Sequence, residues 1–101
     1  MVYFVVINEQ GPAWDQARPM REQTGWAEHA SFMNELTEKR FVVLGGPLKG
    51  DVKHRAMLIV DAPDEPTARQ RLAKDPWMRT GVLRNLTFDP WEVLLGTLPS
   101  P

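Results

Sequence analysis

Six segments with regular hydrophobic patterns follow one another along this chain, and their order constrains the fold more than any other feature. Four of them are short, apolar runs, mostly β-branched, of the kind that form strands. The other two carry apolar residues at three- and four-residue spacing, which is the helical period. We predict strands over residues 2–7, 41–44, 56–60 and 82–88, and helices over residues 25–40 and 64–75. The predicted order is therefore βαββαβ.

Two βαβ halves of this kind fold most economically into one antiparallel sheet with both helices on the same face. The sequence predicts an α+β, ferredoxin-like domain over residues 1–101, with an irregular tail over residues 96–101. Glycine and proline break regular structure, so we expect Gly45-Gly46-Pro47 to close the second strand. Residues 9–24 show no sustained period and are predicted to form a long loop that could cover a site.

Both faces of the predicted sheet are apolar. Alternate positions of the first strand place Phe4 and Val6 on one face, and Val5 and Ile7 on the other. Two helices cover only one face, so we expect a partner to cover the second face, most simply another copy of the chain. The alternative is that the long loop and the tail fold back over that face. We predict a homodimer through the sheet face.

Composition narrows the range of partners and locations. The chain has 12 Lys and Arg against 13 Asp and Glu, so it lacks the basic excess that binds nucleic acid or an anionic membrane. It contains no cysteine, which excludes disulfides and thiol chemistry and fits a reducing compartment. The apolar start is too short to span a bilayer. We expect a cytoplasmic protein with no nucleic-acid or membrane partner.

Connectivity brings chemically useful residues to one edge of the predicted sheet. In a chain that runs alternately up and down, the ends of the first two strands lie beside the start of the first helix and the end of the second. That edge holds His29 and Asp75, which together offer acid–base chemistry. The residues expected to form a substrate pocket beside them are Asn8, Trp26, Gly45, Gly46, Pro47 and Trp77. Asp89-Pro90-Trp91 follows the last predicted strand at the opposite edge, where it could meet a partner's site.

Four segments follow one another in a specific order and spacing: EHASFM over residues 28–33, VLGGPL over 43–48, AKDPW over 73–77 and DPW over 89–91. On these segments the sequence resembles the YCII-related proteins, and the resemblance extends across nearly its whole length. It implies the dimeric ferredoxin-like fold of the muconolactone-isomerase-like α/β-barrel group, with His29 and Asp75 as the active-site pair. A dehydrochlorinase of a chlorinated hydroxyquinone is similar to this family, so the implied chemistry is proton transfer on small polar organic molecules.

His29 and Asp75 each have a catalytic and a structural interpretation. The imidazole of His29 can serve as a general base or acid, and Asp75 would orient it by accepting a hydrogen bond from one ring nitrogen. His29 also lies on the same helix face as Trp26 and Met33, where it could simply fill the contact between helix and sheet. Asp75 precedes Pro76 and is a natural helix N-cap.

Other candidates for chemistry are weaker. We expect His54, between Lys53 and Arg55, to be solvated. The solvent-exposed face of the second helix is expected to carry Arg69, Arg71 and Lys74. With two histidines and no cysteine, no metal site is expected, and Gly45-Gly46-Pro47 lacks the Lys-Ser/Thr ending of a phosphate-binding loop. No cofactor is therefore predicted.

Two functions of different classes remain. The first is a small, cofactor-free isomerase or lyase in which His29, held by Asp75, moves a proton on a ring or enol compound. The second is a non-catalytic dimeric module that binds a small molecule or a partner, with the same pair as a structural hydrogen bond.

Overall fold

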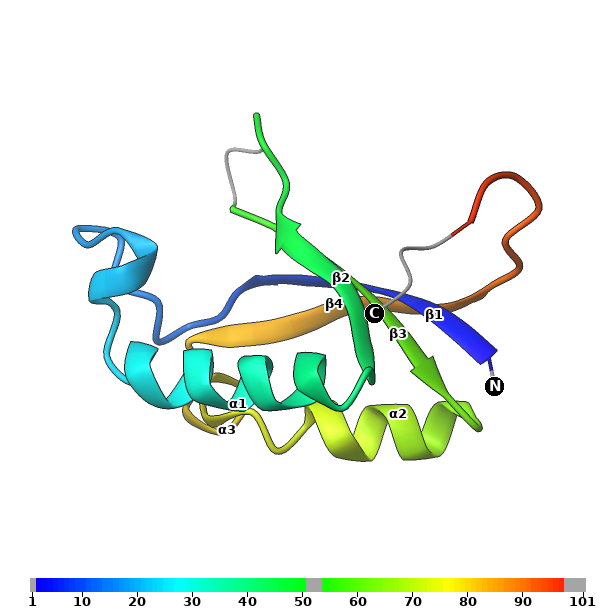
Figure 1. The fold of residues 1–101 in the computed structure, drawn as a ribbon. Coiled ribbons are helices and arrows are strands. Elements are labelled where there is room, and N and C mark those ends of the chain that lie inside the picture. The colour runs from blue at the N-terminus through cyan, green and yellow to red at the C-terminus, as the bar shows by residue number, and fades with distance from the viewer. Residues whose placement is uncertain (1, 51–53, 98–101) are drawn as a thin grey trace.

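The computed structural model of the chain describes residues 2–50 and 54–97, which form a sheet with helices on one face (Figure 1). The elements are β1 (Val2–Gln10), η1 (Met20–Glu22), α1 (Trp26–Glu38), β2 (Val42–Pro47), β3 (Ala56–Ala62), α2 (Glu65–Leu72), α3 (Pro76–Thr80) and β4 (Leu83–Trp91). The four strands are antiparallel and lie in the order β2-β3-β1-β4. This arrangement confirms the predicted α+β, ferredoxin-like fold.

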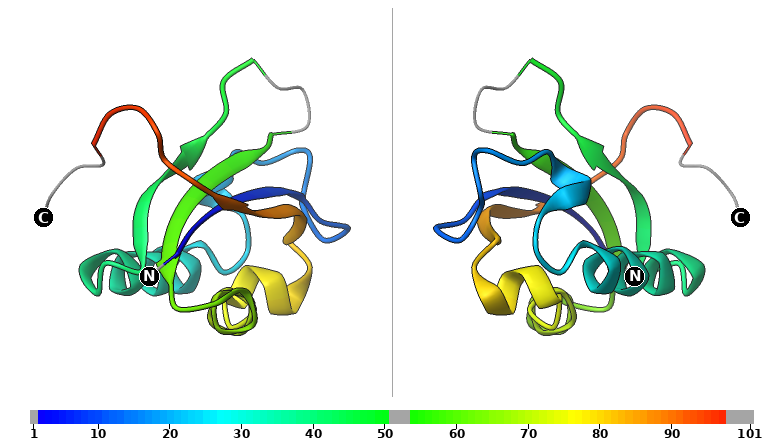
Figure 2. Two further views of the ribbon diagram at one scale, coloured as in Figure 1. Left: turned by 90° about the vertical axis from the view of Figure 1, so that its right-hand side faces the viewer. Right: turned by 90° about the vertical axis from the view of Figure 1, so that its left-hand side faces the viewer.

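The hydrophobic core lies between the sheet and the helices. Figure 2 shows α1, α2 and α3 in one layer beneath the sheet, while the far ends of β2 and β3 rise away from that layer. Phe4 and Val6 of β1 face the helices and are 3% and 1% exposed, as the alternation of the strand predicts. The other buried members of this core are Leu36, Phe41, Val42, Leu58, Val60, Ala62, Ala68, Leu72 and Phe88.

All four predicted strand ends are wrong, because the strands run further than the sequence suggested. β3 continues through Asp61 and Ala62, which pair with β1. β1 continues through Glu9 and Gln10, which pair with β4. β2 continues through Gly45-Gly46-Pro47, which pair with β3, and β4 includes Asp89-Pro90-Trp91, which pair with β1. β2 and β4 are the two edge strands, and an edge strand tolerates proline because its outer side makes no ladder hydrogen bonds.

Two irregularities in strand pairing occur where strands approach the predicted site. The β1–β4 register shifts between Ile7 and Asn8, and the β2–β3 register shifts between Val42 and Leu44, which leaves Val43 without a direct partner. Such bulges redirect the side chains around them and are frequent beside functional sites.

The segment that follows β1 is joined to the turn before β4 by backbone hydrogen bonds. The amide of Gly11 donates to the carbonyl of Val82 (2.8 Å), and the amide of Ala13 donates to that of Gly81 (2.9 Å). Two backbones can lie this close because Gly11 has no side chain. A Cβ atom at Gly11 would lie 2.1 Å from the carbonyl oxygen of Gly81, so part of the backbone would have to move.

Gly11→Ala is therefore expected to destabilise the fold by about 1 to 3 kcal/mol, the usual cost of forcing extra atoms into a packed site. Gly46→Ala is the matched control, since a Cβ there would meet nothing within 4 Å, and its effect should stay within about 0.5 kcal/mol. Urea unfolding of both variants gives the comparison. Equal stabilities for the two variants would contradict the close contact at Gly11.

The outer face of the sheet, away from the helices, remains partly open. Tyr3, Val5 and Ile7 are half-buried there, and Leu44 and Trp91 are 45% and 40% exposed. In the tail, Leu94 and Leu95 are 79% and 91% exposed, so these two side chains do not cover the sheet. The end of the predicted irregular tail, residues 98–101, and Lys53 of the predicted turn lie outside the described residues.

The face of α2 that was predicted to be solvent-exposed is exposed only in part. The guanidinium of Arg69 lies 4.5 Å from the centre of the Phe88 ring, and that of Arg71 lies 4.3 Å from the centre of the Phe41 ring. Both arginines therefore cover the edge of the core, while the side chain of Arg69 remains 51% exposed to solvent. No helix in the described part of the chain is long and apolar enough to cross a membrane.

Candidate active site

His29 and Asp75, 46 residues apart in the sequence, meet beneath the edge of the sheet. His29 lies in the first turn of α1, and Asp75 is the N-cap of α3. The Nδ1 atom of His29 is 2.9 Å from both carboxylate oxygens of Asp75. The pair is well shielded from solvent, because the side chains of His29 and Asp75 are only 13% and 4% exposed.

Asp75 also caps the helix α3 from the same position. Its Oδ1 atom accepts a hydrogen bond of 2.9 Å from the backbone amide of Trp77, which satisfies one of the free amides at the start of α3. Pro76 follows at the first helical position, which suits its fixed φ angle. The predicted N-cap is confirmed, and the same carboxylate reaches both the helix and His29.

The ring of His29 is also held from its flat side. It stacks on the indole of Trp77 with 3.9 Å between ring centres and 10° between planes. Trp77 is itself only 1% exposed, and its Nε1 donates a hydrogen bond of 2.8 Å to the carbonyl of Thr24 just before α1. With Asp75 at its edge and Trp77 on its face, the imidazole has little freedom to turn.

This geometry determines which ring nitrogen is available. An ionised carboxylate only accepts hydrogen bonds, so Nδ1 of His29 must carry the proton that Asp75 receives. The other ring nitrogen, Nε2, has no hydrogen-bond partner among the described residues. In the neutral ring Nε2 therefore carries a lone pair, and it is the atom that can take a proton from a ligand.

A cavity of about 440 Å³ lies beside this pair. That size falls within the range of small-molecule sites, which are mostly apolar with a few polar groups that orient the ligand. Its polar side chains are His29, Asp75, Asn8, Asn34 and Thr37. The remaining lining residues are Met20, Trp26, Met33, Val42, Val43, Leu44, Gly45, Gly46, Pro47, Ala56, Leu58 and Leu83.

The structure brings five of the six expected pocket residues to this cavity. Asn8, Trp26, Gly45, Gly46 and Pro47 all line it. Trp77 does not, because it lies underneath the His29 ring in a second buried cluster with Val82 and Leu83. The expectation for Trp77 is thus corrected from a pocket wall to a support for His29.

Several lining residues were not predicted. Met33 and Thr37 follow His29 at four-residue intervals along α1, so helical spacing could have identified them. Val43 enters the cavity through the bulge in β2, for which the sequence carries no evident signal. His54, by contrast, lies outside the cavity and stacks on Trp14 with 6.3 Å between ring centres.

The long segment between β1 and α1 contributes to the cavity through Met20 and is organised by one buried side chain. Gln23 is 3% exposed. Its amide nitrogen donates to the carbonyls of Asp15 and Arg18, both at 2.8 Å, and its amide oxygen accepts from the backbone amide of Asp15 at 2.9 Å. The predicted loop is therefore folded on itself over residues 15–23 and supports one wall of the cavity.

A metal-binding arrangement is not found in the part of the chain that the structure describes. No three His, Cys, Asp or Glu side chains there converge in a way that could hold an ion.

Asp75→Ala is expected to lower the free energy of unfolding by about 2 to 4 kcal/mol, since it leaves the Nδ1–H of His29 and the amide of Trp77 without an acceptor and each such group costs about 1 to 3 kcal/mol. Asp64→Ala is the matched control: Asp64 caps α2 through the amide of Thr67 in an exposed position. Its loss should destabilise clearly less. Chemical unfolding distinguishes the two, and equal effects would contradict a buried double role for Asp75.

Comparison with known proteins settles the family. The YCII-related domain model matches residues 1–92 of this chain. The chain belongs to the YCII-related family.

Among solved structures, it is similar to the 5-chloro-2-hydroxyhydroquinone dehydrochlorinase of Burkholderia phenoliruptrix AC1100, determined in complex with 2,5-dihydroxybenzoquinone. The TM-score is 0.59 and the identity 18%, over 91% of this chain and 94% of that one, so the similarity shows a shared fold. No curated protein sequence matches this chain.

Proposed function

We propose that this member of the YCII-related family is a small, cofactor-free enzyme that moves a proton on a cyclic enol or hydroxyquinone. The observation that carries the proposal is the geometry of His29: Nδ1 is bound to Asp75 at 2.9 Å, and the free Nε2 belongs to a side chain that lines a cavity of about 440 Å³. A positioned base beside a cavity of ligand size is the minimum that proton transfer requires.

In the proposed reaction, Nε2 of His29 takes a proton from a carbon next to a carbonyl group of the substrate. The electron pair of the broken C–H bond moves toward the carbonyl oxygen and gives an enolate. The resulting imidazolium is stabilised by the carboxylate of Asp75. An isomerisation is completed when the imidazolium returns the proton to a different atom of the substrate. An elimination from a chlorinated hydroxyhydroquinone starts instead from its keto tautomer, in which the chlorine-bearing ring carbon is tetrahedral and carries a hydrogen. Nε2 of His29 takes the proton of the ring hydroxyl that is conjugated with this carbon, and the O–H electron pair forms a C=O bond. The ring double bond shifts to the chlorine-bearing carbon, chloride leaves with its bonding electrons, and His29 releases its proton to solvent.

Asn8 is the proposed partner of the substrate oxygen. It is 5% exposed and lines the cavity, and its Nδ2 group donates no hydrogen bond to any described residue. A buried amide donor stabilises negative charge that develops on an oxygen, because no solvent rearrangement is needed when the charge appears. Asn8 would thus help to stabilise the enolate.

Hydroxylated quinones and hydroquinones are the proposed substrate class. The cavity combines an aromatic wall, Trp26, with polar groups at His29 and Asn8, which suits a flat ring that carries oxygen substituents. The dehydrochlorinase with the same fold adds support, since it acts on a chlorinated hydroxyhydroquinone and binds 2,5-dihydroxybenzoquinone. Both compounds are therefore the first ligands to test.

Chloride release from 5-chloro-2-hydroxyhydroquinone, compared with the uncatalysed rate, tests the proposed reaction. Catalysed release, together with perturbation of the Trp26 environment by 2,5-dihydroxybenzoquinone, is the expected result. If the protein turned over neither this compound nor other hydroxylated quinones, the proposed substrate class would be contradicted.

A non-catalytic binding module is the second candidate, and one observation favours it. Asp75 is already engaged in capping α3, and His29 is packed flat on Trp77, so the pair would be satisfied as a structural element. This candidate expects 2,5-dihydroxybenzoquinone to bind without any chemical change.

A homodimer through the outer face of the sheet is proposed as the assembly. The partly exposed Tyr3, Val5, Ile7, Leu44 and Trp91 support it, because an apolar sheet face of this kind is normally covered.

Ile7→Lys places a charge in that face and is expected to convert the dimer to a monomer, as measured by light scattering coupled to gel filtration. Gln70→Lys, on the exposed side of α2, is the control and should leave the dimer intact. A monomeric wild-type chain at micromolar concentration would contradict the proposal.

A further inference from the structure

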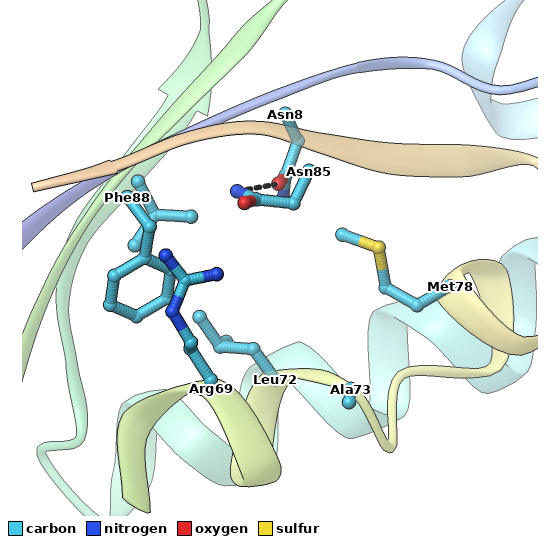
Figure 3. A pocket seen from close by; sticks show the side chains of 8 residues that line it. Asn8, Arg69, Leu72, Ala73, Met78, Asn85 and Phe88 are labelled. Carbon is cyan, nitrogen blue, oxygen red and sulfur yellow. Dashed lines mark hydrogen bonds between the residues drawn. The ribbon is translucent and has the colours of Figure 1, made fainter. Parts of the chain in front are cut away.

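A second cavity lies on the other side of Asn8, between the helices α2 and α3 and the strands β1 and β4. Figure 3 shows it from close by, with Arg69 and Leu72 rising from α2 and Met78 facing them from α3. Its volume is about 250 Å³. The lining residues are Val6, Asn8, Arg69, Leu72, Ala73, Met78, Asn85 and Phe88. Among the residues that the structure describes, Asn8 is the one that this cavity shares with the cavity at His29.

The size and the walls of this cavity suit a single aromatic ring. An engineered cavity of about 150 Å³ lined by apolar side chains holds benzene, so 250 Å³ leaves room for a ring with a substituent. Val6, Leu72 and Phe88 are fixed walls, since all three are less than 10% exposed. Met78 is a flexible side chain that adapts to the shape of a ligand and makes favourable contacts with aromatic rings.

The polar groups of the cavity determine what the substituent must be. The Nδ2 group of Asn85 is already engaged, because it donates to the carbonyls of Thr87 (2.9 Å) and Ile7 (3.2 Å) and to the side chain of Asn8 (3.4 Å). Arg69 is the only charged residue among the described residues of the lining. Its side chain is 51% exposed, so it lies at the mouth of the cavity.

Arg69 is oriented before any ligand arrives. Its Nε donates a hydrogen bond of 2.8 Å to Glu65, and its guanidinium lies over the Phe88 ring. The two terminal nitrogens of Arg69 have no hydrogen bond to any described residue. Two parallel N–H groups held in this way match the two oxygens of a carboxylate.

We propose that this second cavity is a binding site for a monocyclic aromatic carboxylate. The ring occupies the space between Phe88, Leu72 and Met78, and the carboxylate leaves the cavity at its mouth and binds the terminal nitrogens of Arg69. The site adjoins the one at His29 through Asn8, which lines both cavities, but it does not depend on the proposed reaction there.

Benzoate is the probe, and the methionine methyl groups report where it binds. Met78 lines the second cavity, Met20 and Met33 line the cavity at His29, and Met57 lies in β3 outside both. In ¹³C-methyl-methionine NMR, millimolar benzoate is expected to shift the Met78 signal and to leave Met20 and Met33 unchanged. Shifts at Met20 and Met33 would assign the aromatic acid to the cavity at His29. The absence of a shift at every methionine would show that benzoate does not bind. Either outcome overturns the proposal.

Substitution of Arg69 tests the carboxylate contact. Arg69→Gln is expected to weaken benzoate binding at least tenfold, while Arg71→Gln, on the same helix but over Phe41, should leave binding unchanged. Wild-type protein should also prefer benzoate to the neutral benzamide by at least tenfold, and Arg69→Gln should lose that preference. Ala73→Leu fills the cavity from the residue that caps the end of α2 and should abolish the Met78 shift. Equal binding of benzoate by the Arg69 and Arg71 variants would contradict the assignment.

Discussion

His29→Gln should lower the rate of proton transfer by at least about 100-fold, because a positioned general base contributes roughly 10² to 10⁴ to the rate. Glutamine keeps a hydrogen-bond donor that can reach Asp75, but it offers no nitrogen lone pair to a substrate. The measurement is the initial rate of chloride release from 5-chloro-2-hydroxyhydroquinone. The fold should survive, since Trp77 and Asp75 keep their own contacts with Thr24 and α3.

The second histidine provides a matched control. His54 is exposed and lies outside the cavity, so His54→Gln should keep the wild-type rate. Asn8→Ala is expected to reduce the rate by about 100- to 1,000-fold, as the loss of a single oxyanion donor does. An unchanged rate in His29→Gln would exclude His29 as the base and leave the binding module as the better interpretation of the pair.

Trp77→Ala is expected to destabilise the chain by about 3 to 5 kcal/mol, the usual cost of removing a fully buried aromatic side chain. A domain of this size is stable by only about 5 to 15 kcal/mol, so the loss is a large share of the total. The indole of Trp77 supports the His29 ring, contacts Trp26 at 5.6 Å between ring centres and holds the start of α1 through Thr24. Urea unfolding at a fixed protein concentration measures the effect and keeps any dimer contribution constant.

Trp77→Phe separates the packing of the ring from its hydrogen bond. Phenylalanine retains a ring beneath His29 but leaves the carbonyl of Thr24 without its donor, and we expect a loss of about 1 to 2 kcal/mol. Leu94→Ala, at a position that is 79% exposed, should have no measurable effect. If Trp77→Ala proved no more destabilising than Leu94→Ala, the buried support for His29 would be disproved.

The order of elements and the meeting of His29 with Asp75 could be predicted because both follow from local patterns and connectivity. β-branched runs give strands, three- and four-residue spacing gives helices, and only a few topologies join them without crossing. Strand ends were predicted less well. Gly45-Gly46-Pro47 and Asp89-Pro90-Trp91 look like breaks in the sequence, yet they lie in edge strands, and the sequence alone does not show which strand is at an edge.

The parts of the site that escaped prediction depend on contacts between distant segments. The burial of Gln23 results from a loop that folds on itself, and a glutamine in a polar stretch carries no sign of it. Arg69 and Arg71 were predicted to lie on a solvated face, and Arg69 is 51% exposed. The structure also places each guanidinium over an aromatic ring of the core, which the pattern of the helix does not show. Trp77 was expected to line the pocket because it follows Asp75 at the same edge of the sheet, but its indole lies buried beneath the His29 ring.

The tautomer of His29 is the most direct test of the central claim, and it is read from the ¹⁵N chemical shifts of the ring nitrogens. With only two histidines in the chain, His54 serves as an internal reference in the same spectrum. The account predicts a neutral ring protonated at Nδ1, with a free lone pair on Nε2, and a loss of this preference in Asp75→Asn. A neutral ring protonated at Nε2 would contradict the account, because that nitrogen could not accept a proton from a substrate and Nδ1 could not donate to Asp75.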